Sequence, residues 1–365
     1  MRIVLTGGGT GGLLVPLVAV AKKIKEHHTE AEFLFIGPNG TMEKKIIGEA
    51  GIPAKGVVVG KFRRYFSWRN FIDVAKVPLG IIQALWLMLV YMPDAVFSKG
   101  GYASLPVVLV GWLYRIPVFI HESDAMPGLA NTFLARFSER VAVSYSQAEK
   151  YFPPLKVVFT GSPLRENITQ GDAAIARSKF SLVESKKVIF IYGGSQGARN
   201  INNRIVNILP ELLRKYQIIH QTGTANYEEV VRKAGELGIK AGREGYHPVA
   251  FIGEELKDIL AVADLAIFRA GSSSIQEAAA TGKPAILIPL PTSANDHQRM
   301  NAYAVAKDGG CVVLEEENLG EDILMNNIEE IMNDEELRNK LSTNIRTFYH
   351  PEATERIAKG IIGMI

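Results

Sequence analysis

The chain has 365 residues, which is more than one ordinary hydrophobic core holds, so two domains are expected. It is 47% hydrophobic and 22% charged without a low-complexity tract, which excludes a largely disordered protein. The formal net charge of +3 indicates neither nucleic-acid nor membrane binding by itself. The single cysteine, Cys311, excludes a disulfide framework and is expected in the core. No secretory signal pattern opens the chain, so a cytoplasmic protein is expected.

The first half of the chain begins with an apolar strand at 1–6, a glycine loop at 7–12 and a helix at 16–25. Short apolar runs follow, several with helical segments between them. This alternation is typical of a parallel sheet covered by helices on both faces. The predicted further strands are 33–36, 57–59, 95–97, 118–120, 141–143 and 157–159.

The same pattern restarts with a strand at 187–192, a glycine loop at 193–199 and a helix that runs to Leu213. Two such openings predict an α/β protein of two doubly wound, Rossmann-like domains facing each other across a cleft. The pattern breaks at 161–165, so we place the first domain at 1–162 and the second at 163–347. A last helix, about 348–365, is expected to return to the first domain. The further predicted strands are 217–220, 249–252, 265–268 and 285–288.

The glycine loops indicate diphosphate binding without a nicotinamide cofactor. GGGTGG at 7–12 matches G-x-G-x-x-G, but the second strand ends in Gly37, Pro38 and Asn39, where an NAD site needs an acidic residue. KGGYAS at 99–104 and GGSQGAR at 193–199 are loops of the same kind. Small residues let backbone N–H groups approach a diphosphate, although tight turns alone also explain glycines. The sequence has neither a Walker lysine motif nor an Asp-x-Asp pair, so no cofactor and no metal are expected.

Further blocks of sequence make a family resemblance specific. They are HESDAMPGLAN at 121–131, GSPLR at 161–165, GGSQGARNIN at 193–202, FRAGSSSIQEAAATGKPAILIPLP at 268–291 and DHQRMNA at 296–302. With the other glycine loops, they resemble the MurG family of bacterial UDP-N-acetylglucosamine:lipid I transferases over nearly the whole chain. The resemblance implies a GT-B fold and inverting transfer of N-acetylglucosamine from UDP to the muramoyl 4-hydroxyl of lipid I. The product would be lipid II for peptidoglycan synthesis.

The resemblance also implies where the donor binds. UDP-N-acetylglucosamine is expected mainly in the second domain, with the ribose on Glu277, the uracil at Ile252 and the sugar on Gln298. His297 beside Gln298 stands at a position that varies in the family. For Glu277 the simpler alternative is a helix N-terminal carboxylate favoured by the helix dipole. The remaining expected donor contacts are Arg165, Ser195, Ser272, Ser273 and Ser274, with Thr10, Gly11, Gly12 and Asp124 from the first domain.

The acceptor is expected in the first domain. The family pattern continues TGGH, whereas this chain has Leu13, which can neither bind nor deprotonate the acceptor. The remaining candidates for the base are His121, Glu122 and Asp124, of which we favour Asp124 or Glu122. Glu122 is alternatively a buried structural carboxylate bonded to loop amides. The residues expected at the acceptor diphosphate are Gly9, Thr10, Gly11, Gly12, Gly100, Gly101, Tyr102, Ser104 and Asn131.

Leu13 leaves two alternative functions open. One is a catalytically weakened UDP-sugar-binding protein, and the other is a different lipid-directed GT-B glycosyltransferase. Donor binding does not separate these from the enzyme, whereas turnover does.

A basic and aromatic segment at 61–76 precedes 77–92, sixteen residues without a charge. Because ~20 residues are needed to span a bilayer, a peripheral membrane patch is predicted instead, with a buried helix as the alternative. With the resemblance, this implies a protein at the cytoplasmic face of the cell membrane. Its partners would be lipid I, the anionic inner-membrane surface and other cell-wall synthesis and division proteins, but no nucleic acid. The predicted patch consists of Arg63, Arg64, Phe66, Trp68, Arg69 and Trp86.

Overall fold

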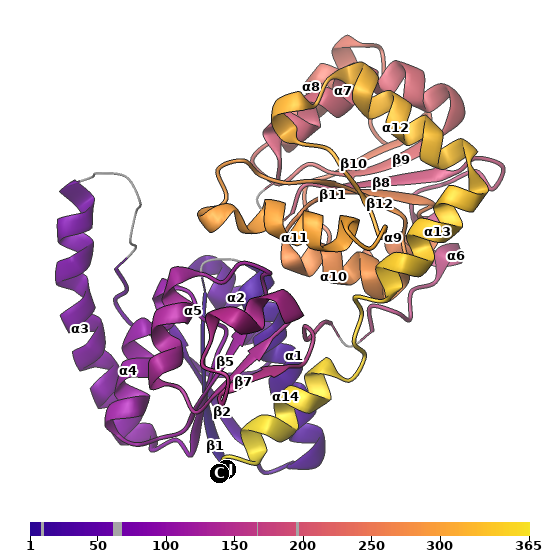
Figure 1. Cartoon of the computed structure of the whole chain (residues 1–365). Helices are drawn as coiled ribbons and strands as arrows, with labels where there is room; N and C mark the ends of the chain where they lie inside the picture. Colours follow the sequence, from indigo (N-terminus) through magenta and orange to yellow (C-terminus); the bar gives the residue numbers. More distant parts are fainter. Residues whose placement is uncertain (9–10, 61–67, 166, 195–196) are drawn as a thin grey trace. The chain divides into compact units, whose positions relative to one another are not determined.

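The computed structural model describes residues 1–8, 11–60, 68–165, 167–194 and 197–365, apart from the side chains of 68–75. It divides into two compact units (Figure 1). Unit 1 comprises Met1–Arg165 and His350–Ile365, and unit 2 comprises Glu166–Tyr349. The chain therefore passes between the units twice, close to the sequence-based divisions at 162/163 and 347/348.

Unit 1 is built on a parallel sheet of seven strands within the described residues, in the order β3-β2-β1-β4-β5-β6-β7. The order reverses between β1 and β4, which pair in register from Ile3 with Ala95 to Thr6 with Ser98. The loops that follow these two strands therefore leave the same edge side by side, where ligands of doubly wound sheets bind. The strands are β1 Arg2–Thr6, β2 Glu32–Gly37, β3 Ala54–Gly56, β4 Ala95–Ser98, β5 Val118–Glu122, β6 Arg140–Val143 and β7 Val157–Phe159.

Helices cover both faces of this sheet because successive strand side chains point to opposite faces. On one face Ile3 and Leu5 pack with Leu17 of α1 and Ile357 of α14. On the other face Val4 packs in a core that includes residues of α3, α4 and α5. The last helix thus belongs to unit 1, where α14 lies along α1 (Figure 1). The helices are α1 Gly11–His27, α2 Thr41–Glu49, α3 Trp68–Tyr91, α4 Leu105–Leu113, α5 Leu129–Leu134 and α14 Ala353–Ile362.

Unit 2 repeats the plan with a parallel sheet, which has six strands in the described residues, in the order β10-β9-β8-β11-β12-β13. Its switch point lies between β8 and β11. The predicted fold class, two doubly wound α/β domains, is therefore confirmed. The strands are β8 Val188–Tyr192, β9 Gln217–Gln221, β10 Tyr246–Val249, β11 Leu265–Arg269, β12 Ala285–Ile288 and β13 Val312–Val313. The helices are α6 Ala173–Lys179, α7 Arg199–Lys215, α8 Tyr227–Glu236, α9 Leu256–Val262, α10 Ser272–Thr281, α11 His297–Ala306, α12 Glu321–Asn333 and α13 Glu335–Arg346.

Two predicted strands were misplaced, and both lie at a sheet edge. The strand predicted at 57–59 is Ala54–Gly56, whose side chains are exposed, while Val57 beyond its end is 5% exposed and packs in the core. The strand predicted at 249–252 is Tyr246–Val249. It contains Pro248, which an edge strand tolerates because one side of its backbone needs no partner. An apolar run indicates a buried segment. At these two edge strands the segment that pairs in the sheet begins before the apolar run instead of coinciding with it.

Candidate functional site

The loop after β4 in unit 1 is held in a conformation that requires glycine. Gly100 has φ +77°, and a Cβ atom there would overlap the side-chain amide of Asn131. The Gly100 N–H donates to Ser98 Oγ at 3.0 Å, and Ser104 Oγ donates to the Gly100 carbonyl at 2.8 Å. Gly101 follows with φ +79°. Four residues predicted at the acceptor diphosphate, Gly100, Gly101, Ser104 and Asn131, thus come together here.

Glu122 accepts hydrogen bonds from several groups of the loop that follows β5. Its carboxylate is 3% exposed. It accepts hydrogen bonds from the Asp124 N–H at 2.9 Å, the Gly128 N–H at 3.1 Å and Asn131 Nδ2 at 2.8 Å. Burial raises the pKa of Glu122, and the negative charge of Asp124 raises it further. These contacts match the structural alternative for Glu122, which leaves half-buried Asp124 as the candidate base.

A buried lysine, to which the sequence reasoning gave no role, ties the same loops together. Lys99 is 1% exposed. Its Nζ atom lies 2.5 Å from His121 Nδ1 and donates a hydrogen bond to Ser123 Oγ. His121 Nε2 lies 3.0 Å from the Gly161 carbonyl. An ammonium donating to Nδ1 fits a neutral imidazole whose Nε2–H donates to that carbonyl. Both ring nitrogens of His121 are therefore engaged, which disfavours it as a base.

The charges of this cluster affect each other. Burial and the neighbouring ammonium of Lys99 hold the pKa of His121 well below its ordinary value. Burial also lowers the pKa of Lys99, against which the carboxylates of Glu122 and Asp124 act. Lys99 is thus the positive charge that accompanies the two acidic residues of this loop. A lysine directly before a glycine pair at a strand end was the sequence signal for it.

The first turn of α1 completes the unit 1 site. Gly11 and Gly12 begin this helix, and Leu13 is half-buried in the same turn. The Leu13 Cδ1 atom lies 3.8 Å from the position that a Cβ atom on Gly101 would occupy. An apolar side chain thus lies next to the predicted acceptor loop. Gly9 and Thr10 are outside the described residues.

In unit 2 the loop after β8 is connected to the segment after β10 by a buried glutamine that the sequence reasoning did not select. Gln221, the last residue of β9, is 1% exposed. Its Nε2 donates to the Gly194 carbonyl at 3.0 Å, and its Oε1 accepts from the Ile252 N–H at 3.1 Å. The predicted uracil contact, Ile252, is therefore fixed relative to the glycine loop. Ser195 is outside the described residues.

The N-terminus of α10 lies at the switch point of unit 2. The helix starts at Ser272 after Gly271, and Ser272, Ser274 and Glu277 are each less than 10% exposed. Ser273 is half-buried. Asn301 Nδ2 lies 3.4 Å from the Ala270 carbonyl and supports the turn. Unpaired N–H groups and the helix dipole favour an anion at such a helix start.

The segment before α11 is strained. Asn295 and Asp296 both have φ 54°, a left-handed conformation that is uncommon for residues other than glycine. The Oε1 atom of Gln298 then accepts from the Leu290 N–H at 3.0 Å, which fixes the side chain predicted to contact the sugar. His297 Nδ1 lies 2.6 Å from the Ala294 carbonyl. Arg165 is half-buried at the end of the first segment of unit 1.

Within the described residues, no group of three or more His, Cys, Asp or Glu side chains is placed to hold a metal ion. Cys311 is buried, as predicted, and burial raises the pKa of its thiol to about 12.

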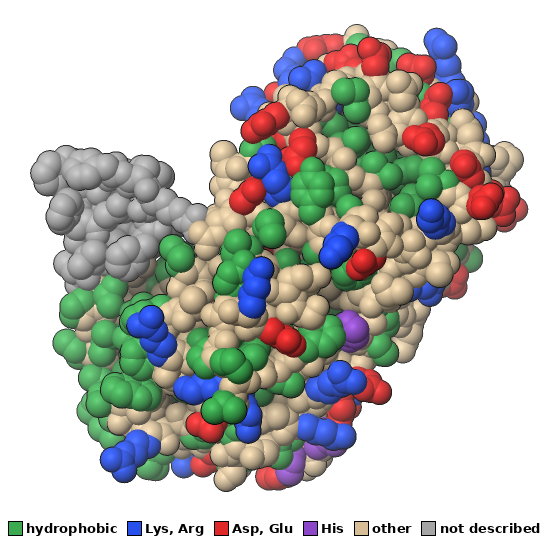
Figure 2. Space-filling model, viewed as in Figure 1, with side chains coloured by type: hydrophobic (Ala, Val, Ile, Leu, Met, Phe, Trp, Pro, Cys, Tyr) green, Lys and Arg blue, Asp and Glu red, His purple; other side chains and the backbone are tan. Residues whose placement is uncertain are grey.

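The outer face of α3 is apolar and exposed. Side chains at helical spacing are between 48% and 67% exposed, namely Leu79, Ile82, Trp86, Leu89 and Val90. Trp112 and Leu113 at the end of α4 are also more than half exposed. Figure 2 shows apolar side chains gathered on this side of unit 1. Arg63, Arg64 and Phe66 are outside the described residues, as are the side chains of Trp68 and Arg69. None of the described helices is both long and apolar enough to cross a bilayer.

Charge is unequally divided between the units. Unit 1 carries 21 Lys and Arg against 13 Asp and Glu, whereas unit 2 carries 20 against 25. The small net charge of the whole chain therefore conceals a basic unit, the one that bears the exposed apolar helix.

The fold and the glycine loops at the switch points agree with one class of protein, the nucleotide-sugar glycosyltransferases with two Rossmann-like domains, and the family models identify this class. Residues 3–143 match the glycosyltransferase family 28 N-terminal domain, and residues 188–357 match the family 28 C-terminal domain. The chain is 38% identical to the UDP-N-acetylglucosamine--N-acetylmuramyl-(pentapeptide) pyrophosphoryl-undecaprenol N-acetylglucosamine transferase 2 of Bacillus cereus, with 99% of each chain covered. It is also 38% identical to the UDP-N-acetylglucosamine--N-acetylmuramyl-(pentapeptide) pyrophosphoryl-undecaprenol N-acetylglucosamine transferase of Clostridium perfringens, with 90% of each chain covered. The chain belongs to this transferase family, and the resemblance seen in the sequence is confirmed.

Solved structures agree with the assignment. The crystal structure of Acinetobacter baumannii MurG is similar, with a TM-score of 0.75, 25% identity and 99% of each chain covered. The UDP-GlcNAc 2-epimerase of Neisseria meningitidis, solved with bound UDP-GlcNAc, has a TM-score of 0.69 at 11% identity over the whole of both chains. At that identity the likeness to the epimerase concerns the fold alone.

Proposed function

We propose that this protein transfers N-acetylglucosamine from UDP-N-acetylglucosamine to the 4-hydroxyl of the muramoyl sugar of lipid I, with inversion at the anomeric carbon. The products are lipid II and UDP, in peptidoglycan synthesis. The observation that carries the proposal is membership of the transferase family over 99% of the chain. The glycine loops at the switch points of both sheets support it, because each can hold one diphosphate.

Unit 2 takes the donor in this proposal. The N-terminus of α10, with Ser272, Ser273 and Ser274, lies against the UDP phosphates, and the Glu277 carboxylate accepts from the ribose hydroxyls. Backbone N–H groups and the helix dipole then stabilise the negative charge that develops on leaving UDP, without a metal ion. Ile252 contacts the uracil, and Gln298 contacts the sugar being transferred.

Unit 1 takes the acceptor, with its diphosphate on the loop of Gly100, Gly101 and Ser104. Asp124 acts as the base: its carboxylate receives the proton of the muramoyl hydroxyl as the oxygen bonds to the anomeric carbon and the bond to UDP breaks. Glu122 and Lys99 hold the loop that carries Asp124, so they are positioning residues. This role for Asp124 is supported by the contacts that occupy Glu122 and His121.

The enzyme works at the cytoplasmic face of the cell membrane as a peripheral protein in this account. The exposed apolar face of α3 and the excess positive charge of unit 1 support binding to an anionic bilayer. Lipid I is embedded in that bilayer, so binding brings the acceptor loops near their substrate.

Leu13 favours a second candidate function, a UDP-sugar-binding protein with little turnover, because its apolar side chain lies beside the acceptor loop. Release of UDP from UDP-N-acetylglucosamine separates the two functions. It should be measured with and without a short-chain lipid I analogue, in the presence of EDTA. Release that depends on the acceptor and persists in EDTA supports the metal-independent enzyme. Donor binding without release in either condition supports the binding protein.

A further inference from the structure

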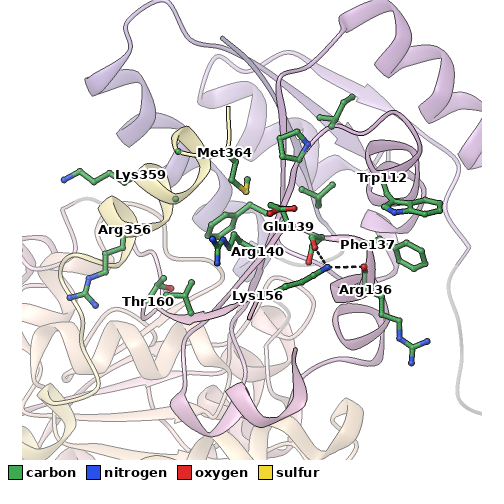
Figure 3. Close-up of a pocket in the computed structure, with 18 of the residues that line it drawn as sticks. Trp112, Arg136, Phe137, Glu139, Arg140, Lys156, Thr160, Arg356, Lys359 and Met364 are labelled. Carbon is green, nitrogen blue, oxygen red and sulfur yellow. Dashed lines mark hydrogen bonds between the residues drawn. The ribbon is translucent and has the colours of Figure 1, made fainter. Parts of the chain in front are cut away.

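A large cavity of unit 1 lies between α14 and the strands β5, β6 and β7, away from the glycine loops. Its volume is about 1340 Å³, and its lining includes Val118 and Arg140, the first residues of β5 and β6, with one side of α14 (Figure 3). Ligands of doubly wound sheets bind at the carboxyl ends of the strands, whereas this cavity adjoins the amino ends of β5 and β6 and extends along the edge strand β7 to Thr160. None of the residues predicted to contact the donor or the acceptor lines it. It is therefore separate from the proposed acceptor site. We call it the α14 cavity.

The lining of the α14 cavity is strongly basic. Arg356 and Lys359 are paired with Glu352 and Glu355 of their own helix, at 2.9 and 3.0 Å. The other bases form no ion pair with a described residue. Lys156 Nζ donates to the Ser138 carbonyl at 2.6 Å, which satisfies a hydrogen bond but does not cancel the charge. The basic lining residues are Arg115, Arg136, Arg140, Lys156, Arg356 and Lys359, against the single acidic lining residue Glu139.

The cavity also has an apolar floor and an aromatic rim. Phe119 and Phe159 line the floor, and α14 comes so close that a Cβ on Gly360 would lie 2.8 Å from Phe119 Cε2. Trp112, 55% exposed, contacts Phe137 edge to face with the ring centres 5.2 Å apart. In Figure 3 these two rings lie on one side of the cavity and α14 lies on the other. Apolar surface and positive charges that form no ion pair with a described residue are thus combined in one concave site, where low-dielectric walls strengthen the field.

We propose that the α14 cavity binds a phosphate-bearing anion that also carries an apolar part. Guanidinium and ammonium groups are the preferred partners of phosphate oxygens, and the floor and rim bury the apolar part. An anionic phospholipid and a soluble phosphate compound share this chemistry. The proposal does not depend on the transferase activity, because the cavity is lined by none of the residues proposed to contact the donor or the acceptor.

Binding to the full-length protein tests this by calorimetry with three probes. Dihexanoyl phosphatidylglycerol, kept below its micelle concentration, represents an anionic lipid without a bilayer that the α3 face could bind. Phenyl phosphate represents a soluble phosphate compound with an apolar part, and dihexanoyl phosphatidylcholine provides a lipid of no net charge. The variant is Arg356→Gln with Lys359→Gln, which removes two exposed charges and two ion pairs within one helix. Its control is Arg232→Gln with Lys233→Gln on α8, where both bases also have glutamate partners four residues away on the same helix.

We expect one of the two anions to bind and phosphatidylcholine to bind more weakly. The α14 variant should lose about tenfold in affinity for that anion, and the α8 control should retain it. Binding of the lipid alone identifies a headgroup site, and equal or tighter binding of phenyl phosphate identifies a soluble phosphate ligand. The proposal is overturned if neither anion binds, or if the α14 variant binds as well as the control. UDP release with a soluble acceptor should be the same in both variants as in the unaltered protein. If the unaltered protein itself releases no UDP, that result contradicts the transferase proposal and leaves the cavity proposal unaffected.

Discussion

Lys99 is the residue on which the unit 1 site most depends, because a buried ammonium is costly unless its charge and hydrogen bonds are matched. Replacing Lys99 with Met leaves His121 Nδ1 and Ser123 Oγ without that donor and removes positive charge beside Glu122 and Asp124. We expect kcat to fall by about tenfold or more while the KM for UDP-N-acetylglucosamine stays the same. Loss of the charge should also move the acidic limb of the pH–rate profile to higher pH.

The exposed Lys44→Met variant of α2 is the control for this change, and it should match the unaltered enzyme. An unchanged pH–rate profile in folded Lys99→Met protein would limit Lys99 to a packing role.

His220 makes unit 2 sensitive to acid. Its Nδ1 lies 3.0 Å from the Tyr246 hydroxyl, its Nε2 lies 3.0 Å from Asn202 Oδ1, and burial lowers its pKa to about 3. In the unfolded chain His220 has its ordinary pKa of about 6.5, so as the pH falls the unfolded state binds a proton at His220 before the folded state does. The stability that neutral His220 contributes is therefore complete above pH 6.5 and declines below it. Between pH 7 and pH 5 we expect the free energy of unfolding of the unaltered protein to fall by about 2 kcal/mol more than that of the His220→Gln variant. Urea unfolding at the two pH values measures the difference. Equal decreases in the two proteins would show that the folded protein does not hold His220 neutral.

Among the structural elements, the loop after β4 has the least room for change. Gly100→Ala would place a methyl group against Asn131 and force a non-glycine residue to φ +77°. We expect the KM for a soluble lipid I analogue to rise by about tenfold or more, while donor affinity, measured by calorimetry with UDP, is unchanged. Gly128→Ala is a suitable control, because no atom lies within 4 Å of a Cβ built there. Equal kinetics of the two variants would count against this loop as the acceptor site.

The α3 helix carries the membrane prediction. Replacing Ile82 and Trp86 with Ser removes two exposed apolar side chains, and the matched change Ile175→Ser on α6 of unit 2 removes one that is 53% exposed. We expect the α3 variant to bind anionic vesicles several-fold more weakly in a sedimentation assay, and the α6 variant to bind normally. Binding should also decrease as salt rises. Normal binding by the α3 variant would assign the membrane contact to another surface.

At this scale the sequence predicted the central strands and the edge strand β7 well, but it misplaced the edge strands β3 and β10. The apolar runs at 95–97 and 265–268 coincide with β4 and β11, which are buried on both faces and therefore must be apolar. The edge strands β3 and β10 contain exposed or polar residues, and the apolar runs begin at or after their last residues. The strands were therefore predicted too late in the chain. Lys99 and Gln221 were missed for a related reason: their roles arise from contacts between loops that only the folded sheet brings together.

For the whole molecule, repetition of one sheet topology in two units explains why a glycine loop follows the first strand of each unit, β1 and β8. In the proposed function each switch point provides one diphosphate site, and a reaction between two diphosphate-bearing substrates needs two. The family relationship extends over both units. The unequal charge of the units agrees with the assignment of the lipid-linked acceptor to unit 1, since an anionic bilayer attracts the basic unit.

The most direct test of the proposed transfer is the structure of the product. The protein should be incubated with UDP-N-acetylglucosamine and a short-chain lipid I analogue, and the purified lipid product examined by mass spectrometry and NMR. We expect one added N-acetylglucosamine, joined by a β-linkage to the 4-oxygen of the muramoyl sugar. Recovery of unmodified acceptor, with the donor intact, hydrolysed or epimerised, would contradict the assignment.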